Sequence, residues 1–258
     1  MANLYYREDL DASDIVPGSL VEVSGDEGRH AVRVSRLRVG ERTAIGDGAG
    51  ALGEGAVESV AKDRFTVRID RVIPSAPPAG PRLVLVQALA KGDRDERAVE
   101  QATEFGVDAI VPWQAARSVS RWDGSGAQEK IAKGLAKWRR VAREASKQSM
   151  RARIPEVREP VLLDGLREIA SREQETVVVL HPRGTSRVST WARSAAESAH
   201  PADELLLVVG PEGGFAGDEL DGLEEAGASI LLLGDTVLRT SSAGPAALAV
   251  LNAAFQRW

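Results

Sequence analysis

Two loops in the second half of the sequence carry residue types that suit ligand binding. Gly210-Pro-Glu-Gly-Gly214 directly follows the apolar run Leu205 to Val209, and a helical pattern from Asp218 to Ala226 comes after it. Glycines at the carboxyl end of a strand permit positive φ angles and close approach of the backbone to a ligand. The second loop, Gly234 to Ala243, contains Thr240-Ser-Ser just before an apolar helix. Those hydroxyls either cap the helix or hold a ligand against its first turn. Together the two loops predict one shared pocket.

Other glycine patterns argue against sites for nucleotide phosphates. Gly48-Ala-Gly-Ala-Leu-Gly53 matches the GxGxxG fingerprint, but the residues after it alternate like a strand and do not open a helix. We therefore interpret this segment as a hairpin turn, which disfavours the alternative of an enzyme with a nicotinamide cofactor. The phosphate-loop pattern GxxxxGK followed by Ser or Thr does not occur, so the sequence gives no support to ATP or GTP cleavage.

The pocket loops belong to a pattern that predicts a parallel α/β sheet. Apolar runs typical of buried strands cover residues 83–89, 109–111, 177–180, 205–209 and 229–233. Helical segments separate them, for example Asp95 to Phe105, which Gly106 closes as a C-terminal cap. Apolar strands that alternate with helices indicate a parallel sheet covered on both faces. Ligands bind such sheets beyond the carboxyl ends of the strands, where both loops would lie.

A proline-rich stretch divides the chain. Residues 74–81 contain four prolines, which neither continue a helix nor pair within a sheet, so we expect a linker there. Residues 1–73 consist of short alternating segments broken by glycine, which is typical of a small β-barrel or sandwich, with one helical turn around 30–37. Residues 82–258 form the α/β domain. The expected fold class is therefore α/β with a separate N-terminal β-domain.

Composition excludes several classes of protein. The chain of 258 residues contains no cysteine, which removes disulfides and thiolate chemistry, and its three histidines (His30, His181 and His200) lack metal-ligand spacing. No apolar run reaches the ~20 residues needed to cross a bilayer, and the first residues show no signal-peptide pattern. We expect a soluble, cytoplasmic protein without a metal site.

Positive charge is concentrated in two places although the net charge is −5. From Lys130 to Arg153 there are nine basic residues and one acidic residue, a local net charge of +8. A helix over 131–151 would place its apolar side chains on one face and basic side chains on the other. The basic residues of that face are Lys133, Lys137, Arg140, Lys147 and Arg151. The second basic run contains Arg29, His30, Arg33, Arg36 and Arg38. An ordinary solvated helix face mixes the signs of its charges, so we predict that both surfaces bind RNA.

The pattern over residues 246–255 predicts a helix that is apolar on nearly all sides. Such a helix must be buried. It either packs inside the fold or forms a subunit interface, and we favour a homodimer.

In chain order, these segments resemble one family over essentially the whole sequence. The motifs are His30-Ala-Val-Arg-Val-Ser-Arg-Leu-Arg-Val-Gly40, Ala88-Leu-Ala-Lys-Gly92, Glu100-Gln-Ala-Thr-Glu-Phe-Gly-Val107, Arg117-Ser118, Glu144-Ala145 with Gln148-Ser149, Arg153-Ile-Pro155, Gly210 to Phe215, and Leu233-Gly234 followed by Leu238-Arg239-Thr240. The ordered set resembles the RsmE family of 16S rRNA uridine N3-methyltransferases.

The resemblance implies a fold, a reaction and a set of partners. The implied fold is an N-terminal PUA-like β-barrel, which binds RNA, and a C-terminal parallel-sheet SPOUT domain with a deep trefoil knot. The implied protein is a homodimer that binds S-adenosyl-L-methionine in the knot and methylates N3 of a specific uridine in 16S rRNA, within the small ribosomal subunit. The implied cofactor contacts are Leu180, His181, Gly210, Pro211, Glu212, Gly213, Gly214, Leu233, Gly234, Leu238, Arg239 and Thr240. Ser241 and Ser242 stand where the family often has Glu-Thr, so no glutamate role carries over to that position.

Two side chains are candidates for the chemistry of this reaction. Uridine N3 is a poor nucleophile until its proton leaves, so the reaction needs a base and a group that stabilises the anion. Arg239 is the candidate stabiliser because it always carries charge. Glu212 is the candidate base, or alternatively it orients its loop by hydrogen bonding. The alternative function is that of a non-enzymatic RNA-binding or ribosome-assembly protein, which would leave the two loops without a purpose.

Overall fold

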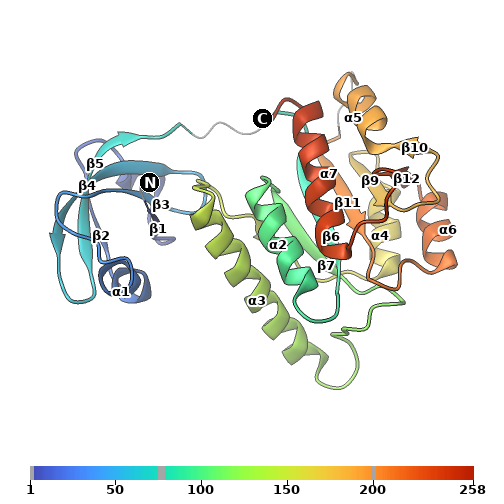
Figure 1. The fold of residues 1–258 in the computed structure, drawn as a ribbon, viewed down its shortest axis with the longest axis horizontal. Coiled ribbons are helices and arrows are strands. Elements are labelled where there is room, and N and C mark those ends of the chain that lie inside the picture. Colours follow the sequence, from blue (N-terminus) through green and yellow to red (C-terminus); the bar gives the residue numbers. More distant parts are fainter. Residues whose placement is uncertain (1–2, 75–78, 199–201) are drawn as a thin grey trace. The chain divides into compact units, whose positions relative to one another are not determined.

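The computed structural model describes residues 3–74, 79–198 and 202–258 (Figure 1). The chain divides into two compact units, an N-terminal unit of Met1–Pro77 with Arg143–Ile154, and a C-terminal unit of Pro78–Ala142 with Pro155–Trp258. The sequence pattern assigned residues 143–154 to the C-terminal domain, whereas their contacts place them in the N-terminal unit. His200 and residues 75–78 of the expected linker lie outside the described residues.

The N-terminal unit is built on a curled, barrel-like sheet of five strands in the order β1-β3-β4-β5-β2. These are β1 (Leu4–Tyr6), β2 (Leu20–Val23), β3 (Arg42–Gly46), β4 (Leu52–Val60) and β5 (Phe65–Val72). β1 pairs in parallel with β3, and the other pairs are antiparallel. The helix α1 (Gly25–Arg33) and the 3₁₀ turn η1 (Ala12–Asp14) complete the unit. Alternate residues of β5 (Phe65, Val67 and Ile69) are fully buried, as the period of a half-buried strand requires. The expected small β-barrel is confirmed.

The GxGxxG segment is a hairpin turn between β3 and β4, as predicted. The two strands pair antiparallel, with Gly46 opposite Leu52. The turn is held by Asp47, whose Oδ1 accepts hydrogen bonds from the backbone N–H groups of Ala49, Gly50 and Ala51 at 2.8, 2.9 and 2.9 Å. The Asp47 side chain thus satisfies three backbone donors of the turn, which is a structural role for this segment.

Residues 143–154 join the N-terminal unit through specific contacts. The Tyr6 hydroxyl donates to the carbonyl of Arg151 at 2.6 Å, and the N–H of Ile154 donates to the carbonyl of Gly48 at 2.9 Å. Met150 and Ile154 pack with Leu4 and Tyr6 in one apolar cluster. Burial raises the pKa of Tyr6 to about 12, so its hydroxyl remains a donor at neutral pH.

One predicted RNA contact is corrected by this packing. Lys147 was expected on the exposed face of its helix, but only 9 % of its side chain is exposed. Its ammonium pairs with Glu27 of α1 at 3.0 Å and with Glu144 at 3.5 Å. The sequence pattern of one helix could not reveal Glu27, which is distant in sequence and supplies the carboxylate that keeps Lys147 inside.

The C-terminal unit contains a seven-stranded sheet in the order β10-β12-β9-β11-β6-β7-β8, and all of its pairs are parallel. The strands are β6 (Arg82–Ala88), β7 (Ala109–Trp113), β8 (Glu156–Val157), β9 (Glu175–Leu180), β10 (Ser186–Arg187), β11 (Glu204–Val209) and β12 (Ser229–Leu232). The central strands β6, β9 and β11 are apolar runs buried on both sides, which is why the sequence pattern located them.

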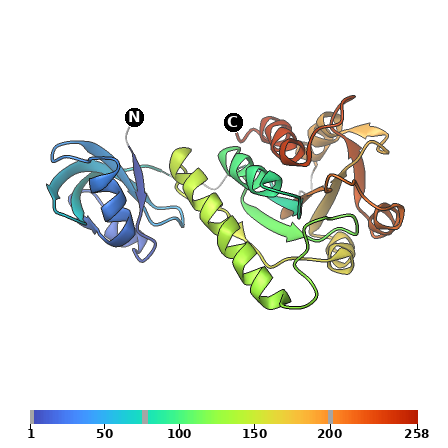
Figure 2. The same cartoon turned by 60° about the horizontal axis from the view of Figure 1, so that its bottom comes forward.

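Helices cover both faces of this sheet (Figures 1 and 2). Leu83 and Leu85 of β6 share one core with helices α2 (Arg94–Glu104), α5 (Val188–Ala196) and α7 (Thr240–Ala254) and the first part of α3 (Ala127–Gln148). Val84 and Val86 point to the other face and share a core with α4 (Leu163–Ala170) and α6 (Gly217–Glu225). The parallel sheet covered on both faces is therefore confirmed.

The helix α7 begins earlier than the sequence pattern indicated. The expected start was Ala246, but the helix begins at Thr240 and includes Pro245, which is buried in its second turn. Proline lacks only one N–H donor, and packing against the core compensates for that loss. Within the described parts of the chain, no helix is long and apolar enough to cross a membrane. The trefoil knot and the homodimer stay predictions.

Candidate active site

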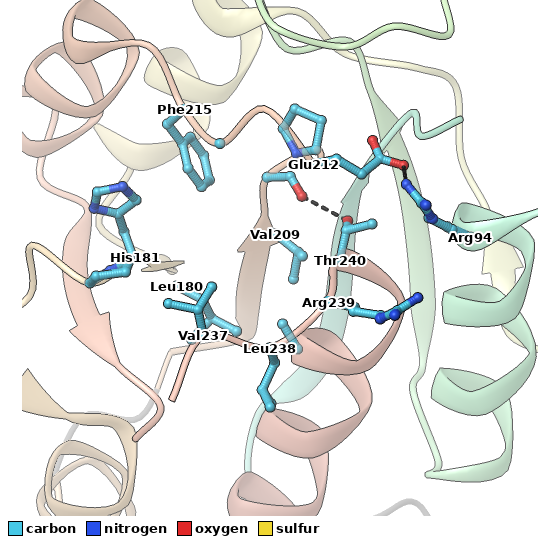
Figure 3. A pocket seen from close by; sticks show the side chains of 15 residues that line it. Arg94, Leu180, His181, Val209, Glu212, Phe215, Val237, Leu238, Arg239 and Thr240 are labelled. Atoms are coloured by element: carbon cyan, nitrogen blue, oxygen red, sulfur yellow. Dashed lines mark hydrogen bonds and ion pairs between the residues drawn. The ribbon is translucent and has the colours of Figure 1, made fainter. Parts of the chain in front are cut away.

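A cavity of about 460 Å³ lies beyond the carboxyl ends of β9 and β11 in the C-terminal unit (Figure 3). Its walls come from the segment after β9, the glycine loop after β11, and the segment that leads into α7. Its lining residues are Arg94, Leu180, His181, Pro182, Val209, Gly210, Pro211, Glu212, Gly214, Phe215, Val237, Leu238, Arg239, Thr240 and Ala243. The position agrees with the rule that open parallel sheets bind ligands beyond their carboxyl ends.

The cavity has an apolar middle and a charged side. In Figure 3, Leu180, Val209, Val237 and Leu238 lie between His181 and Phe215 on one side and Arg94, Glu212 and Arg239 on the other. A mostly apolar pocket with a few placed polar groups is typical of sites for small organic ligands.

His181 contributes a neutral imidazole. Burial and the nearby Arg183 guanidinium lower its pKa, so the ring is uncharged at neutral pH. Its Nδ1 accepts a hydrogen bond from the N–H of Arg183 at 3.1 Å, which assigns the remaining proton to Nε2. The ring also contacts Phe215 edge to face, with centroids 5.8 Å apart.

A side chain is disfavoured at each of the three glycines of the loop, for a different structural reason. Gly214 has a φ of +68°, the left-handed region that side chains disfavour. A Cβ on Gly210 would lie 2.7 Å from the Phe215 ring, and one on Gly213 would lie 3.1 Å from Cβ of Arg117. The loop is therefore shaped by one backbone conformation and two close side-chain approaches.

Buried hydrogen bonds fix the carbonyls at the end of β11. The indole Nε1 of Trp113 donates to the carbonyl of Val209 at 2.9 Å, and the ring stacks with Phe215 at 5.5 Å. The Thr240 hydroxyl donates to the carbonyl of Gly210 at 2.7 Å. The interpretation of this hydroxyl as a helix cap is wrong, because Arg239 is the N-cap residue of α7 and Thr240 is its first helical residue.

Glu212 accepts hydrogen bonds from the loop after β6 and from the first residue of α2. Its Oε1 accepts hydrogen bonds from the guanidinium of Arg94 at 2.6 Å and from the N–H of Lys91 at 3.1 Å. Burial alone would raise the pKa of Glu212, but the hydrogen bond from Arg94 and those from backbone N–H groups lower it overall. The carboxylate is therefore ionised at neutral pH. Arg239 is exposed, and no described carboxylate lies within ion-pair distance of it.

The structure brings together most of the side chains predicted for the cofactor site. Those that line the cavity are Leu180, His181, Gly210, Pro211, Glu212, Gly214, Leu238, Arg239 and Thr240. Gly213, Leu233 and Gly234 lie in the same loops but are not lining residues. The prediction missed Arg94, Pro182, Val209, Phe215, Val237 and Ala243. Phe215, Pro182 and Val237 adjoin predicted residues, so extending each loop would have found them, whereas Arg94 comes from a separate part of the chain.

The basic residues predicted to bind RNA are largely exposed. Arg29, His30, Arg33, Arg36 and Arg38 are exposed on α1 and the segment after it, and Lys133, Lys137 and Arg140 are exposed on α3. Lys137 pairs with Glu96 at 2.5 Å, and Arg29 pairs with Asp26. Arg151 is half-buried, and its carbonyl accepts from Tyr6. No group of three metal-ligating side chains occurs within residues 3–74, 79–198 and 202–258.

Two protein-family models match the two parts of this chain. Residues 78–252 match the model of an RNA methyltransferase domain, and residues 23–70 match that of an RNA methyltransferase PUA domain. The sheet, the cavity at its carboxyl edge and the barrel-like unit are thus those of an RNA methyltransferase.

Relatives and solved structures narrow the class to a family. Ribosomal RNA small subunit methyltransferase E of Mycobacterium tuberculosis is 43% identical over 262 residues, which cover 100% of this chain and 94% of the relative. The Bacillus subtilis protein of the same name is 28% identical over 256 residues, 96% of this chain and 95% of its own. A methyltransferase from Legionella pneumophila, solved with S-adenosylmethionine bound, is 30% identical with a TM-score of 0.80 over 98% of each chain. The chain belongs to the ribosomal RNA small subunit methyltransferase E family, RsmE.

Proposed function

We propose that this protein transfers the methyl group of S-adenosylmethionine to N3 of a specific uridine in 16S rRNA of the small ribosomal subunit, in the cytoplasm. The observation that carries the proposal is the cavity beyond β9 and β11, in a chain that belongs to the RsmE family. The Legionella structure, at 30% identity, was solved with the same methyl donor.

The residues around the cavity fit S-adenosylmethionine. Its volume of about 460 Å³ is in the range of small-molecule sites, and Leu180, Leu238 and Ala243 offer an apolar surface for an adenine ring. Gly210 and Gly214 carry no side chain, so the backbone of this loop can approach a ligand closely. We assign to cofactor binding the lining residues named above together with Gly213, Leu233 and Gly234 of the same loops.

S-adenosylmethionine, when bound, supplies an electrophilic methyl group on a sulfonium. The protein must therefore bring the uridine ring in line, accept the N3 proton and stabilise the charge that moves onto O2 and O4 of the base. Arg239 suits the last task, because its guanidinium lines the cavity without a carboxylate partner among the described residues.

The contacts of Glu212 define what it does for the loop. One oxygen, Oε1, joins the glycine loop to Lys91 and Arg94, which is a positioning role. The role of base requires the other oxygen, Oε2, to accept the N3 proton. A Glu212→Gln variant separates the two roles: the amide can still join the loops but cannot take the proton, so full turnover in this variant would exclude the base role.

The basic surfaces are the proposed contacts with rRNA. Arg29, His30, Arg33, Arg36 and Arg38 form one such surface in the N-terminal unit, and Lys133, Lys137 and Arg140 form another on α3. Exposed side chains that are all positively charged suit contact with RNA phosphates. Such contacts fix the position of the RNA on the protein and make the affinity for RNA depend on salt concentration. Lys147 is excluded from this set because it is buried and paired.

We also propose a homodimer and a knotted SPOUT chain. Support for the dimer comes from α7, an apolar helix on which Ala246, Ala249 and Val250 stay partly exposed although its inner face is buried. Sedimentation of the purified protein would give twice the monomer mass if this is right, and the monomer mass if it is wrong.

The proposed reaction is tested with radiolabelled S-adenosylmethionine and small ribosomal subunits from a strain that lacks the methylation. After transfer, the RNA is digested to nucleosides. Label in N3-methyluridine is the expected result. Label in another nucleoside would overturn the assignment of the acceptor atom. Neither transfer nor cofactor binding would favour a non-enzymatic RNA-binding protein.

A further inference from the structure

A fully buried glutamine is the second-last residue of β6, a strand whose other buried residues are all apolar. Gln87 has 0 % of its surface exposed, while the other buried residues of β6 are Leu83, Val84, Leu85, Val86 and Ala88. In the sheet it is level with Val209 of β11 on one side and with Pro112 of β7 on the other. Gln87 is not a lining residue of the cavity.

The side chain of Gln87 begins a chain of hydrogen bonds that ends at the glycine loop. Its Nε2 donates to the Thr240 hydroxyl at 2.9 Å, and that hydroxyl donates to the carbonyl of Gly210 at 2.7 Å. The directions are fixed by chemistry. A carbonyl oxygen can only accept a hydrogen bond. The single hydroxyl proton of Thr240 is therefore donated to the carbonyl of Gly210, and the hydroxyl oxygen accepts from Gln87.

The same logic fixes the orientation of the glutamine amide. With Nε2 turned toward Thr240 and toward the carbonyl of Ala88 at 3.2 Å, no described residue donates to Oε1. A buried acceptor without a donor is costly, and an apolar side chain at this position would avoid the cost. The fold therefore keeps a polar group where core packing alone would favour leucine or methionine.

Gly210 and Thr240 line the cavity from two different loops, so the bond between them sets the distance between the glycine loop and the start of α7. We infer that Gln87 is a positioning residue for the methyl-donor site: its amide orients the Thr240 hydroxyl, which ties the two loops together. The inference rests on the proposed function and deepens it. It assigns a role in cofactor affinity to a residue that does not itself line the cavity.

The first test replaces Gln87 by methionine, which has a similar shape and no donor. We expect S-adenosylmethionine to bind about tenfold more weakly by titration calorimetry, the scale of one lost hydrogen bond. Asn252→Leu is the matched control. Asn252 is also buried, at 1 % exposure, donates one hydrogen bond to the carbonyl of Phe105 at 2.6 Å and has an oxygen without a donor. It lies far along α7 from the cavity lining. Urea unfolding of both variants shows how much stability each loses.

A second test uses pH to separate orientation from mere packing. In Gln87→Glu, a protonated carboxyl can donate to Thr240 and an ionised one cannot. Cofactor affinity of this variant should rise as the pH falls, relative to the wild type at each pH. Adding Thr240→Val should abolish that dependence, and Gln87→Met with Thr240→Val should bind no more weakly than the weaker single variant.

The outcomes distinguish this inference from the proposed function. If the wild type binds no S-adenosylmethionine, the proposed function fails. If the wild type binds and Gln87→Met binds equally well, or weakens only as much as Asn252→Leu does, Gln87 has no positioning role. Affinity of Gln87→Glu that does not change with pH relative to wild type would also overturn the inference.

Discussion

The substitution Gly210→Ala tests whether the close approach of Phe215 to the glycine loop shapes the cofactor site. A Cβ at this position would lie 2.7 Å from Cε2 and 2.9 Å from Cδ2 of Phe215, whereas carbon atoms pack best at about 3.5–4.0 Å. The ring must therefore move by roughly 1 Å in Gly210→Ala. Trp113 stacks with Phe215 at 5.5 Å and is fully buried, and Phe215 lines the cavity, so a shift of the ring changes the cavity wall.

The expected cost follows from overpacking, which is about 1–3 kcal/mol for inserted carbon atoms in a packed site. Since about 1.4 kcal/mol corresponds to a tenfold change, Gly210→Ala should weaken S-adenosylmethionine binding by about 5- to 150-fold. Gly217→Ala is the control. Gly217 is the first residue of α6 and does not line the cavity, and a Cβ there would meet no atom within 4 Å. This substitution should leave affinity unchanged and stabilise the helix by up to about 1 kcal/mol.

Titration calorimetry gives the affinities and urea unfolding gives the stabilities. The reasoning predicts a large loss of affinity for Gly210→Ala and none for Gly217→Ala. If Gly210→Ala binds the cofactor like the wild type, then Phe215 does not form part of the wall that the cofactor contacts, and the steric argument is refuted.

Three further predictions concern stability and RNA binding. Arg257→Met should cost about 3–5 kcal/mol, because it leaves the Asp108 carboxylate, whose side chain is only 11% exposed, without its charged partner at 2.9 Å, while the exposed Arg97→Met should cost about 0.5 kcal/mol or less in the same urea titration. Burial raises the pKa of Asp95 to about 6, so its contribution to stability is fully present below pH ~4 and is lost as the pH rises through 6. Unfolding curves of the wild type and Asp95→Ala, compared at pH 4 and pH 7.5, should differ in pH dependence by up to about 3 kcal/mol, and parallel curves would contradict the shift. Arg140→Gln should reduce the slope of log affinity for rRNA against log salt by about 1, as measured by filter binding; an unchanged slope would remove Arg140 from the phosphate contacts.

The sequence predicted the central elements of the C-terminal unit because their signals are local. β11 and β9 are continuous apolar runs, and the glycine loop follows β11 directly, so a strand and its ligand loop could be read together. Short elements have no such signal. β8 and β10 have two residues each, and they exist only because a neighbouring strand offers hydrogen bonds.

Contacts between distant parts of the chain account for the features that were missed. Arg94 reaches the cavity only because β6 pairs with β11, which brings the start of α2 beside the glycine loop. Lys147 looked like part of an exposed stripe until Glu27 of α1 was placed beside it. In the sequence Gln87 is one polar residue near the end of an apolar run, and its connection to Thr240 and Gly210 depends on the whole sheet.

The central claim is that the cavity beyond β9 and β11 holds the methyl donor of an rRNA methyltransferase. The most direct test blocks the cavity with the variant Leu180→Trp, which places a large ring among the lining residues. The control is Leu162→Trp, because Leu162 is 61% exposed and does not line the cavity. Methyl transfer to small ribosomal subunits is then measured for both. Loss of cofactor binding and of transfer in Leu180→Trp, with normal transfer in Leu162→Trp, is the predicted result. Normal transfer by a folded Leu180→Trp variant would place the methyl donor elsewhere and contradict the claim.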